Sequence, residues 1–533
     1  MRNVGTDVDV IVVGGGPVGM AMALDLRARG IGFLLLEAGD LSVDHPKVSN
    51  IGPRSMELFR RWGISDRIRN AGWPADHPLD CVWITRVGGY ELYRLDRGTM
   101  ADRPHFRHTP EPEAICPQHW LTPLLSEKIG IYPDGPIRTG TRLTDWTEDD
   151  DGVVVTMQHD ATGRTSTASA RYLVACDGAH SWMRAASGID LTRLHRTQVF
   201  RNILFRAPKL RAQLGSRSAM FYYLVLSSQL RFPMRALDGQ ELYRLTVGVD
   251  NAAEELPAAE LLDRAIALDT PATVLSDNRW HLVHQVADRF RNGRMFLVGD
   301  AAHTLSPSGG FGMNTGICGA ADLGWKLEAQ LDGWAGPGLL DTYETERKPV
   351  ALEGLAEANR NLERTMRREV PEHLDWDDAE GERARSAMAE RLAKSGVAKE
   401  FDSPLIHLGF RYSSPIVATE PSDPATGEIT GPSSAPGSRA PHAWIRAGVS
   451  TLDLFGSGFR LLCFTESDRL DGFERAFRDC GVPLASNRLL EDEVAAVYER
   501  PFVLVRPDGH VAWRGKELPA DPAALADQVR GMY

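Results

Sequence analysis

The sequence predicts an α/β fold with three parts: a parallel strand–helix–strand domain, a β-sheet domain inserted into it, and a small C-terminal α/β domain. Near the N-terminus a β-branched apolar run, a glycine-rich turn and a helical pattern follow one another. Two later apolar runs also stop at an acidic residue beside a glycine. The segments between these runs alternate apolar and polar residues, which is typical of a separate sheet.

The first unit lies in residues 9–37. Residues 9–13 (DVIVV) read as a buried strand, residues 17–29 as a helix, and residues 33–36 as a second strand that ends in Glu37. The glycine-rich turn stands between the first strand and the helix. This order is a βαβ unit of the Rossmann type.

Two further strands are expected in the same sheet. Residues 172–176 (YLVAC) stop at Asp177-Gly178, and residues 295–298 (MFLV) stop at Gly299-Asp300. Because ligands bind at the carboxyl ends of such strands, we expect one binding site at that edge. The domain is then discontinuous, and we assign to it residues 1–76, 105–190 and 285–370.

The rest of the chain divides into three parts. We predict a mixed or antiparallel β-sheet substrate domain in residues 77–104 and 191–284. A helical region and linker follow in residues 371–430, and residues 421–441 are rich in Pro, Ser, Gly and Ala. Residues 315–369 read as one long helical region, and residues 431–533 as the C-terminal domain.

Composition excludes several classes of partner. The net charge of −12 argues against nucleic acid and anionic membranes, which bind basic surfaces. No run approaches the ~20 apolar residues of a membrane span, and no signal peptide is evident, so we expect a cytoplasmic protein. The six cysteines are scattered without a C-x-x-C pair, so we expect no metal site and no redox dithiol.

The glycine-rich turn predicts dinucleotide binding. Gly14, Gly16 and Gly19 stand at G-x-G-x-x-G spacing, and Pro17 opens the helix. Glycines allow a tight turn and close approach of the pyrophosphate, while the helix N-terminus offers N–H groups. The Glu37 carboxylate can accept hydrogen bonds from ribose hydroxyls. This motif does not distinguish FAD from NAD.

A second motif comprises residues 294–303 (RMFLVGDAAH) and 307–316 (PSGGFGMNTG). It resembles the aromatic-hydroxylase class of flavoprotein monooxygenases, the phenol and polyketide hydroxylases. The resemblance implies FAD, with the Gly-Asp aspartate near the ribityl chain or pyrophosphate and the glycine turn at the flavin pyrimidine edge. A helix N-terminus there stabilises negative charge on reduced flavin. The residues implied are Gly299, Asp300, Pro307, Gly309, Gly310, Gly312, Met313 and Asn314.

Other positions match the class less specifically. Asp177, in the stretch DGAHS, is implied to lie near FAD and the nicotinamide cofactor, and Gln118 matches a position that meets FAD. Arg54 opens the helix expected beneath the flavin, and Arg184 belongs to the same segment as Asp177; for both arginines a structural salt bridge is the alternative. Lys47 replaces the arginine that the class commonly has near the flavin, so we expect weaker retention of FAD.

The sequence has one complete dinucleotide fingerprint and no redox dithiol. This favours an FAD-dependent monooxygenase that meets NADH or NADPH transiently, reduces its flavin and then uses O₂.

Three segments carry a closer resemblance: residues 51–63 (IGPRSMELFRRWG), 199–208 (VFRNILFRAP) and 503–514 (VLVRPDGHVAWR). They resemble the flavoproteins of indolocarbazole biosynthesis. The resemblance implies oxidative decarboxylation or hydroxylation of a planar aromatic carboxylated intermediate made from two tryptophans, together with a cytochrome P450. Phe221 and Arg244 match the rebeccamycin branch, which favours an arcyriaflavin-type aglycone as product.

Substrate-binding candidates lie in the inserted sheet. Arg235 and Arg244 are nine residues apart, but the Asp238-Gly239 turn predicts a hairpin that brings both to one pocket. Guanidinium groups there would bind carboxylates in bidentate fashion. As catalytic residues we propose Arg235, Arg244, Phe221 and Trp280. We also expect apolar walls from Tyr222, Tyr223 and Phe232; the alternative is that the aromatic residues are core and the arginines surface.

Two other functions remain open. One is an FAD- and NAD(P)H-dependent hydroxylase of phenols or aromatic polyketides, and the other is a flavin-bearing protein that sequesters a reactive intermediate. The C-terminal domain resembles the thioredoxin-like appendage of phenol-hydroxylase relatives, where a structural or dimerisation role is the default. We expect a monomer or a homodimer.

Overall fold

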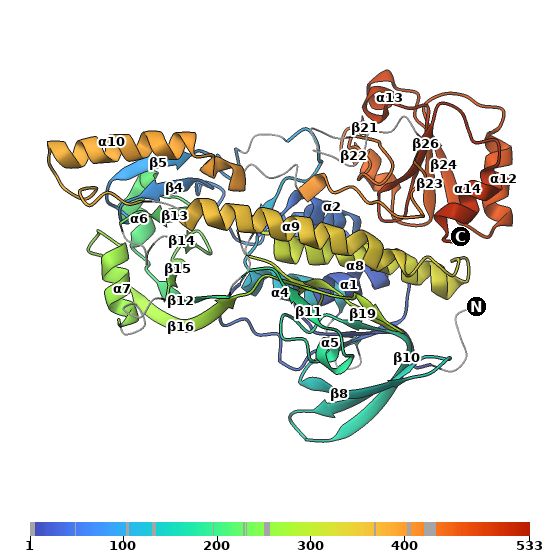
Figure 1. The fold of residues 1–533 in the computed structure, drawn as a ribbon, viewed down its shortest axis with the longest axis horizontal. Helices are drawn as coiled ribbons and strands as arrows, with labels where there is room; N and C mark the ends of the chain where they lie inside the picture. The colour runs from blue at the N-terminus through green and yellow to red at the C-terminus, as the bar shows by residue number, and fades with distance from the viewer. Residues whose placement is uncertain are drawn as a thin grey trace.

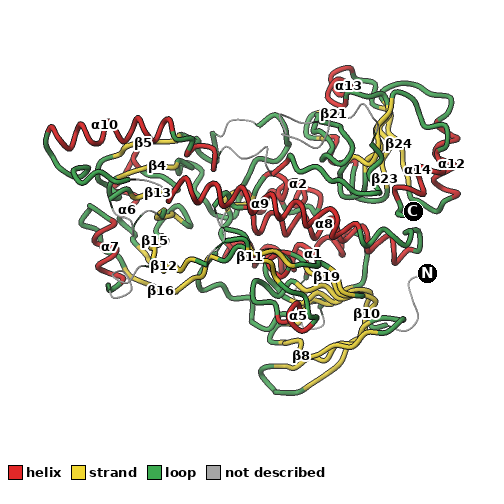
Figure 2. Tube along the Cα trace, in the orientation of Figure 1, coloured by secondary structure: helices red, strands yellow, loops and turns green. Residues whose placement is uncertain are grey.

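The computed structural model of the chain contains three main sheets with helices packed against them (Figure 1). Figure 2 shows the strands gathered in three places and long helices between them. The predicted α/β fold class is confirmed. The structure describes residues 6–47, 50–102, 106–130, 135–195, 197–226, 230, 232–249, 256–306, 308–366, 369–401, 407–419 and 433–533.

The central sheet has the predicted parallel strands. β1 (Val8–Val13) lies between β2 (Phe33–Leu36) and β10 (Thr165–Ala175), and β19 (Met295–Leu297) pairs with β10, all in parallel. The carboxyl ends of β1, β2, β10 and β19 therefore meet at one edge of the sheet. The sheet is completed by β7 (Ile137–Arg138), β8 (Thr141–Glu148), β9 (Val153–His159) and β18 (Arg291–Asn292).

Two long helices run side by side across the middle of the molecule (Figure 1). The expected helical region 315–369 is in fact α8 (Phe311–Asp332) and α9 (Thr342–Met366). Gly333, at φ +81°, ends α8 because a left-handed residue interrupts the helix. The other helices of this domain are α1 (Pro17–Ala28), α2 (Pro53–Arg61), α3 (Ser65–Arg69), α4 (Gln118–Ile129) and α5 (Trp182–Ala186).

The second sheet has seven strands in the order β16-β12-β15-β14-β13-β4-β5. It is mixed, because β13 pairs in parallel with β4 while the other pairs are antiparallel. Its apolar face packs with α6 (Leu210–Leu214) and α7 (Ala258–Ala265), and α10 (Ala379–Lys394) covers one end of the opposite face. The strands are β4 (Cys81–Ile84), β5 (Glu91–Leu95), β12 (Gln198–Arg206), β13 (Phe221–Leu224), β14 (Pro233–Ala236), β15 (Leu242–Gly248) and β16 (Thr273–Leu282).

The C-terminal domain has four strands in the order β24-β23-β25-β26. β23 and β24 are parallel and joined by α12 (Leu470–Asp479), and an antiparallel hairpin and α14 (Pro522–Val529) follow. This is the arrangement of a thioredoxin-like fold. The strands of this domain are β23 (Phe459–Cys463), β24 (Leu484–Arg488), β25 (Phe502–Val505) and β26 (Val511–Gly515), and it also contains α13 (Asp492–Tyr498).

The remaining strands are short. A three-stranded sheet consists of β11 (Leu191–Arg193), β17 (Gln285–Ala287) and β20 (His303–Thr304). Two separate pairs are β3 (Asn50–Ile51) with β6 (Ala114–Ile115), and β21 (Trp444–Arg446) with β22 (Val449–Ser450).

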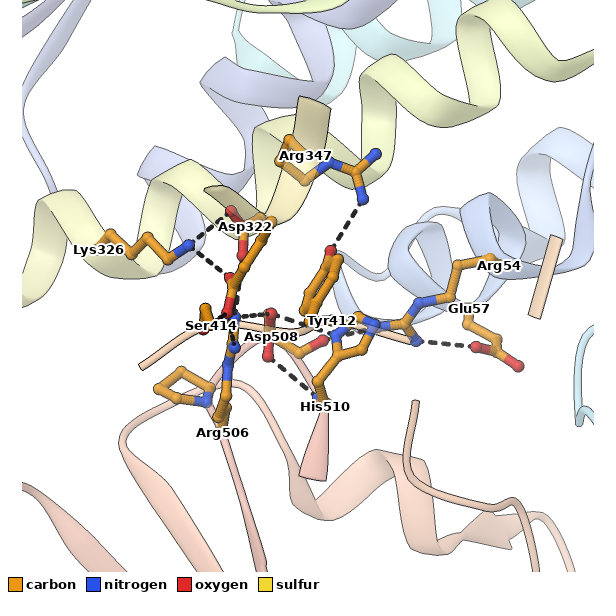
Figure 3. A network of polar contacts seen from close by, with 12 residues as sticks. Arg54, Glu57, Asp322, Lys326, Arg347, Tyr412, Ser414, Arg506, Asp508 and His510 are labelled. Atoms are coloured by element: carbon orange, nitrogen blue, oxygen red, sulfur yellow. Dashed lines mark hydrogen bonds and ion pairs between the residues drawn. The ribbon is translucent and has the colours of Figure 1, made fainter. Parts of the chain in front are cut away.

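A buried ion network fastens the C-terminal domain to α8 and α9 (Figure 3). Arg506, after β25, donates to Glu346 at 2.6 Å and to Asp322 at 3.0 Å. Lys326 donates to the same two carboxylates at 2.7 and 2.9 Å. All four side chains are buried. Because a buried charge without a partner is costly, this network fixes where the domain sits.

Candidate active site

The glycine-rich turn has the geometry that a pyrophosphate site needs. Gly14 has φ +108°, and a Cβ on it would lie 2.3 Å from the carbonyl oxygen of Cys176. A Cβ on Gly19 would lie 1.9 Å from the carbonyl oxygen of Gly14. At Gly16, by contrast, a Cβ would meet nothing within 4 Å. Backbone is therefore open to a ligand at Gly16, at the start of α1, where Pro17 is the first residue and no side chain caps the N–H groups.

Glu37 lies where the prediction placed it, at the end of β2. Its two carboxylate oxygens accept hydrogen bonds from the backbone N–H of Gly15 at 2.5 Å and of Gly39 at 2.6 Å. The carboxylate is thereby fixed beside the turn, with further lone pairs left to accept from hydroxyls. Its contact with ribose stays a prediction.

The Gly299-Asp300 segment meets the glycine-rich turn. A Cβ on Gly316 of α8 would lie 2.6 Å from the Val18 side chain and 3.0 Å from the Cα of Gly299, so the starts of α1 and α8 are in close contact. The Asp300 side chain is exposed at this edge of the sheet. Desolvation by the neighbouring protein raises the pKa of its carboxyl group, while the charge of Lys47 lowers it. An exposed carboxylate at this position can accept hydrogen bonds from ligand hydroxyls.

The second glycine turn forms the start of α8. Gly309 and Gly310 have φ of +83° and +68°, in the left-handed region. The side chain of Asn314 is committed to the protein: its amide N–H donates to the carbonyl oxygen of Gly310 at 2.7 Å, and its oxygen accepts from the N–H of Gly52 at 2.8 Å. The backbone N–H groups of Gly312 and Met313, in the first turn of α8, remain the predicted contacts to the flavin. Pro307 lies outside the described residues.

The loop 45–47 contacts both Gln118 of α4 and the seven-stranded sheet. The N–H of Lys47 donates to the Gln118 side chain at 3.4 Å, so these two predicted FAD residues are neighbours. His45 hydrogen-bonds Ser276 on β16 through Nδ1 at 2.8 Å. The loop therefore bridges the central domain and the seven-stranded sheet.

Two predicted arginines are engaged by protein groups. Arg54 donates to Glu57 at 2.9 Å and to the carbonyl oxygen of Asp508 at 2.6 Å, which joins it to the C-terminal domain. This is the structural alternative, and a flavin contact of Arg54 remains only a prediction. Arg184 donates to the carbonyl oxygen of Ala301 at 2.8 Å. It thereby holds the Asp177 segment, whose carboxylate accepts from the N–H of Met183 at 3.2 Å, against the Gly-Asp segment.

The seven-stranded sheet brings Phe221, Arg235 and Arg244 into one row. Arg235 pairs directly with Arg244 across β14 and β15, and Phe221 pairs with Arg235 across β13 and β14. Directly paired residues point to the same face, so the predicted hairpin does gather both arginines. The Arg235 guanidinium lies 4.4 Å from the centre of the Phe221 ring.

Both arginines lie in a poorly solvated place. Burial lowers the pKa of Arg244, and the neighbouring charge of Arg235 lowers it further. Burial also lowers the pKa of Arg235. Two adjacent guanidinium groups that remain charged and are removed from water favour an anion between them.

The aromatic residues divide between the two faces. Because side chains alternate along a strand, Phe221 and Tyr223 share the face of Arg235, whereas Tyr222 points to the other face. Tyr222 is buried in the core of that face, and its hydroxyl accepts from the N–H of Ala219 at 2.7 Å. The expectation that Tyr222 lines the pocket is therefore wrong.

Trp280 lies on the arginine face but farther along the sheet. Its ring stacks on Phe200 with centroids 5.6 Å apart, and Phe232 meets Phe200 edge-on at 4.4 Å. It stands four residues along β16 from Ser276, which is about 13 Å at the usual strand rise. Trp280 can therefore border only the far end of a long, flat ligand.

Some neighbours of the site were not predicted. Phe401 lies 5.4 Å from Phe221 between ring centroids, and the Tyr223 hydroxyl donates to Glu400 at 3.4 Å. Both residues follow α10, about 180 positions after β13, and no local pattern marks them. Their contribution depends on how α10 folds over the sheet.

Two known protein families match this chain. A family described as FAD binding domain matches residues 7–358, and one described as aromatic-ring hydroxylase, C-terminal, matches residues 433–532. The chain belongs to the family of FAD-dependent aromatic-ring hydroxylases. It is an FAD-dependent monooxygenase, for which NAD(P)H is the usual reductant.

The relatives of this hydroxylase include enzymes with solved structures. RebC, a rebeccamycin biosynthetic enzyme solved with reduced flavin, is 58% identical, with a TM-score of 0.95, over 99% of this chain and 100% of RebC. RebC soaked with chromopyrrolic acid, with bound 7-carboxy-K252c, is also 58% identical, with a TM-score of 0.96, over 99% of this chain and 100% of that one. The 4-methyl-5-nitrocatechol 5-monooxygenase of Burkholderia sp is 32% identical over 99% of this chain and 97% of its own length.

Within the described ranges, no group of three or more His, Cys, Asp or Glu side chains is arranged to hold a metal ion. In that same part of the chain, no helix is both long and apolar enough to span a bilayer.

Proposed function

We propose that this monooxygenase acts on a planar, carboxylated indolocarbazole intermediate. With reduced flavin and O₂ it carries out an oxidative decarboxylation that leads to an arcyriaflavin-type aglycone, in a pathway that includes a cytochrome P450. The observation that carries the proposal is the cross-strand pair Arg235 and Arg244 on the face of the sheet toward the loop 45–47.

The pair suits a carboxylate ligand. Guanidinium groups bind carboxylates through two parallel hydrogen bonds, and two of them side by side suit an acidic group or a dicarboxylate. The Phe221 ring beside them offers a flat apolar surface of the kind that a polycyclic ligand covers. The related RebC, which bound 7-carboxy-K252c after a soak with chromopyrrolic acid, supports this class of substrate.

FAD, when bound, supplies the redox chemistry and the activation of O₂. The residues of the chain hold the reactants. Gly16 and the start of α1 receive the pyrophosphate, and the start of α8 provides N–H groups at the flavin edge. Arg235 and Arg244 orient the carboxyl group, which leaves as CO₂, while Phe221 and Tyr223 exclude water from the ring that is oxidised.

A double substitution tests the proposal. Changing Arg235 and Arg244 to Met should abolish product formation, while FAD binding to the purified protein stays close to wild type. Arg211 provides a matched control, because it lies on α6 beyond the opposite face of the sheet and pairs with Asp76. Arg211→Met should retain full turnover. Undiminished turnover by the double variant would refute the assignment.

Hydroxylation of a phenol or an aromatic polyketide is the second candidate. It is favoured by relatives such as the aklavinone 12-hydroxylase DnrF of Streptomyces peucetius, 34% identical over 87% of this chain. A simple phenol would then stimulate NAD(P)H consumption with release of hydroxylated product. Labelling with ¹⁸O₂ separates both reactions from sequestration of an intermediate, since only oxygenation places the label in the product.

A further inference from the structure

His407 lies against the turn that begins α8. It belongs to the segment between α10 and the C-terminal domain. Its ring stacks on Phe311 with centroids 5.1 Å apart and planes 26° apart. The ring also makes a hydrogen bond to the backbone of Gly309. It covers Gly52 so closely that a Cβ on Gly52 would lie 2.9 Å from the imidazole Nδ1.

The residues that His407 contacts are the ones that shape the flavin-edge turn. Gly309 has a left-handed backbone, and Phe311 is the first residue of α8. Gly52 is connected to the same turn through Asn314, because the N–H of Gly52 donates to the Asn314 side chain. The turn is therefore held on one side by Asn314 and on the other by His407.

The segment that carries His407 is fixed to the rest of the protein. The hydroxyl of Tyr412 accepts from Arg347 of α9 at 2.8 Å, and its ring stacks on His510 of the C-terminal domain at 4.2 Å. Ser414 donates to Glu346 at 2.6 Å, within the ion network of Figure 3. A continuous set of contacts thus runs from the C-terminal domain through residues 407–414 to the turn at Gly309.

We propose that His407 is a positioning residue for FAD: it holds the Gly309–Gly310 turn from outside, and the docked C-terminal domain holds His407. The ring is partly buried, and this desolvation lowers its pKa, which keeps it neutral near pH 7. This inference rests on the placement of FAD at the start of α8. It assigns the C-terminal domain a part in flavin binding without any dithiol chemistry.

Titration of the apoprotein with FAD tests this role. His407→Phe keeps a ring that can stack on Phe311 but removes the donor to Gly309. It should raise the Kd for FAD about five- to tenfold and alter the visible spectrum of the bound flavin, with little change in the melting temperature of the apoprotein. His407→Gln, which restores an N–H donor, should recover most of the affinity.

Tyr498→Phe is the control for stability. It removes a buried hydrogen bond from the Tyr498 hydroxyl to the carbonyl oxygen of Pro441, inside the C-terminal domain, and should lower the melting temperature while the Kd for FAD stays unchanged. An unchanged Kd and flavin spectrum in His407→Phe would overturn the proposal. So would an equal loss of affinity in Tyr498→Phe, since that would mean a general loss of stability. Turnover by the Arg235 and Arg244 variants reports on the substrate separately, so the two proposals can fail independently.

Discussion

Arg244 donates a hydrogen bond from Nη1 to the carbonyl oxygen of Pro46, 2.9 Å away. One guanidinium therefore joins the seven-stranded sheet to the loop that carries Lys47. The charge of Lys47 acts in turn on Asp300. Arg244 thus connects the candidate substrate site to the candidate flavin site, beside the hydrogen bond of His45 to Ser276.

Replacing Arg244 by Lys should weaken substrate binding more than flavin binding. Lysine keeps the charge but loses the planar fork, so we expect KM to rise about 10- to 100-fold and the Kd for FAD only about two- to fivefold. Steady-state kinetics and FAD titration measure the two effects. Arg211→Lys serves as control. Equal changes in KM and in the Kd for FAD would contradict the prediction that Arg244 acts mainly on substrate binding.

Gly16→Ala should impair FAD binding without disturbing the fold. No protein atom lies within 4 Å of a Cβ at Gly16, so the new methyl group would extend into the space assigned to the pyrophosphate. We expect a rise in the Kd for FAD of about 10- to 100-fold, or about 1.4–2.8 kcal/mol. The control is Gly472→Ala, which also meets nothing within 4 Å but lies in α12 of the C-terminal domain. Wild-type affinity in Gly16→Ala would exclude this turn as the FAD site.

Arg506→Met should strongly destabilise the protein. It leaves Glu346, Asp322 and Asp508 buried with fewer positive partners, and breaking such a network costs about 3–5 kcal/mol. Chemical denaturation followed by circular dichroism measures the change. Arg488 is the control because its ion pair with Glu466 is mostly exposed, so Arg488→Met should cost less than about 1 kcal/mol. Similar losses in the two variants would contradict the importance of the network.

Acid should destabilise the protein through His303, in the Gly-Asp motif. Burial, together with the charge of Arg347, lowers the pKa of His303 to about 3. The folded state therefore prefers the neutral ring, and this contribution is complete above about pH 6.5 and declines as the pH falls toward 3. At pH 5 the loss is about 2 kcal/mol. The stability of His303→Gln should fall less between pH 7.5 and pH 5, and an unchanged pH dependence would argue against this linkage.

Phe221→Val should change the product rather than abolish turnover. The ring lies 4.4 Å from the Arg235 guanidinium and forms a flat wall beside it. A smaller side chain lets the substrate shift relative to the flavin, so we expect a larger share of the less oxidised lactam and a smaller share of the arcyriaflavin-type aglycone. Chromatography of the products measures the ratio, with Tyr222→Phe, on the other face, as control. An unchanged ratio would remove Phe221 from product selection.

Local patterns identified much of the nucleotide-binding part. The β-branched runs, the spacing of Gly14, Gly16 and Gly19, and the Gly299-Asp300 segment each depend on residues close in sequence. Backbone conformation and strand–helix order follow from such short-range constraints. The Asp238-Gly239 turn likewise predicted that Arg235 and Arg244 would meet, and the register of β14 and β15 places them opposite each other.

Other features were decided only by tertiary structure. Tyr222 is buried because its face of the sheet is the one that packs against α6 and α7. Arg54 turns to Asp508 of a domain some 450 residues later, and His407 reaches Gly309 only after α10 has crossed the sheet. The sequence by itself determined the fold class, FAD as the cofactor and the pair of arginines, because these depend on local geometry and on motifs. Which side chains surround that pair and which support the turn depended on long-range packing, where burial and charge pairing among distant segments select one arrangement.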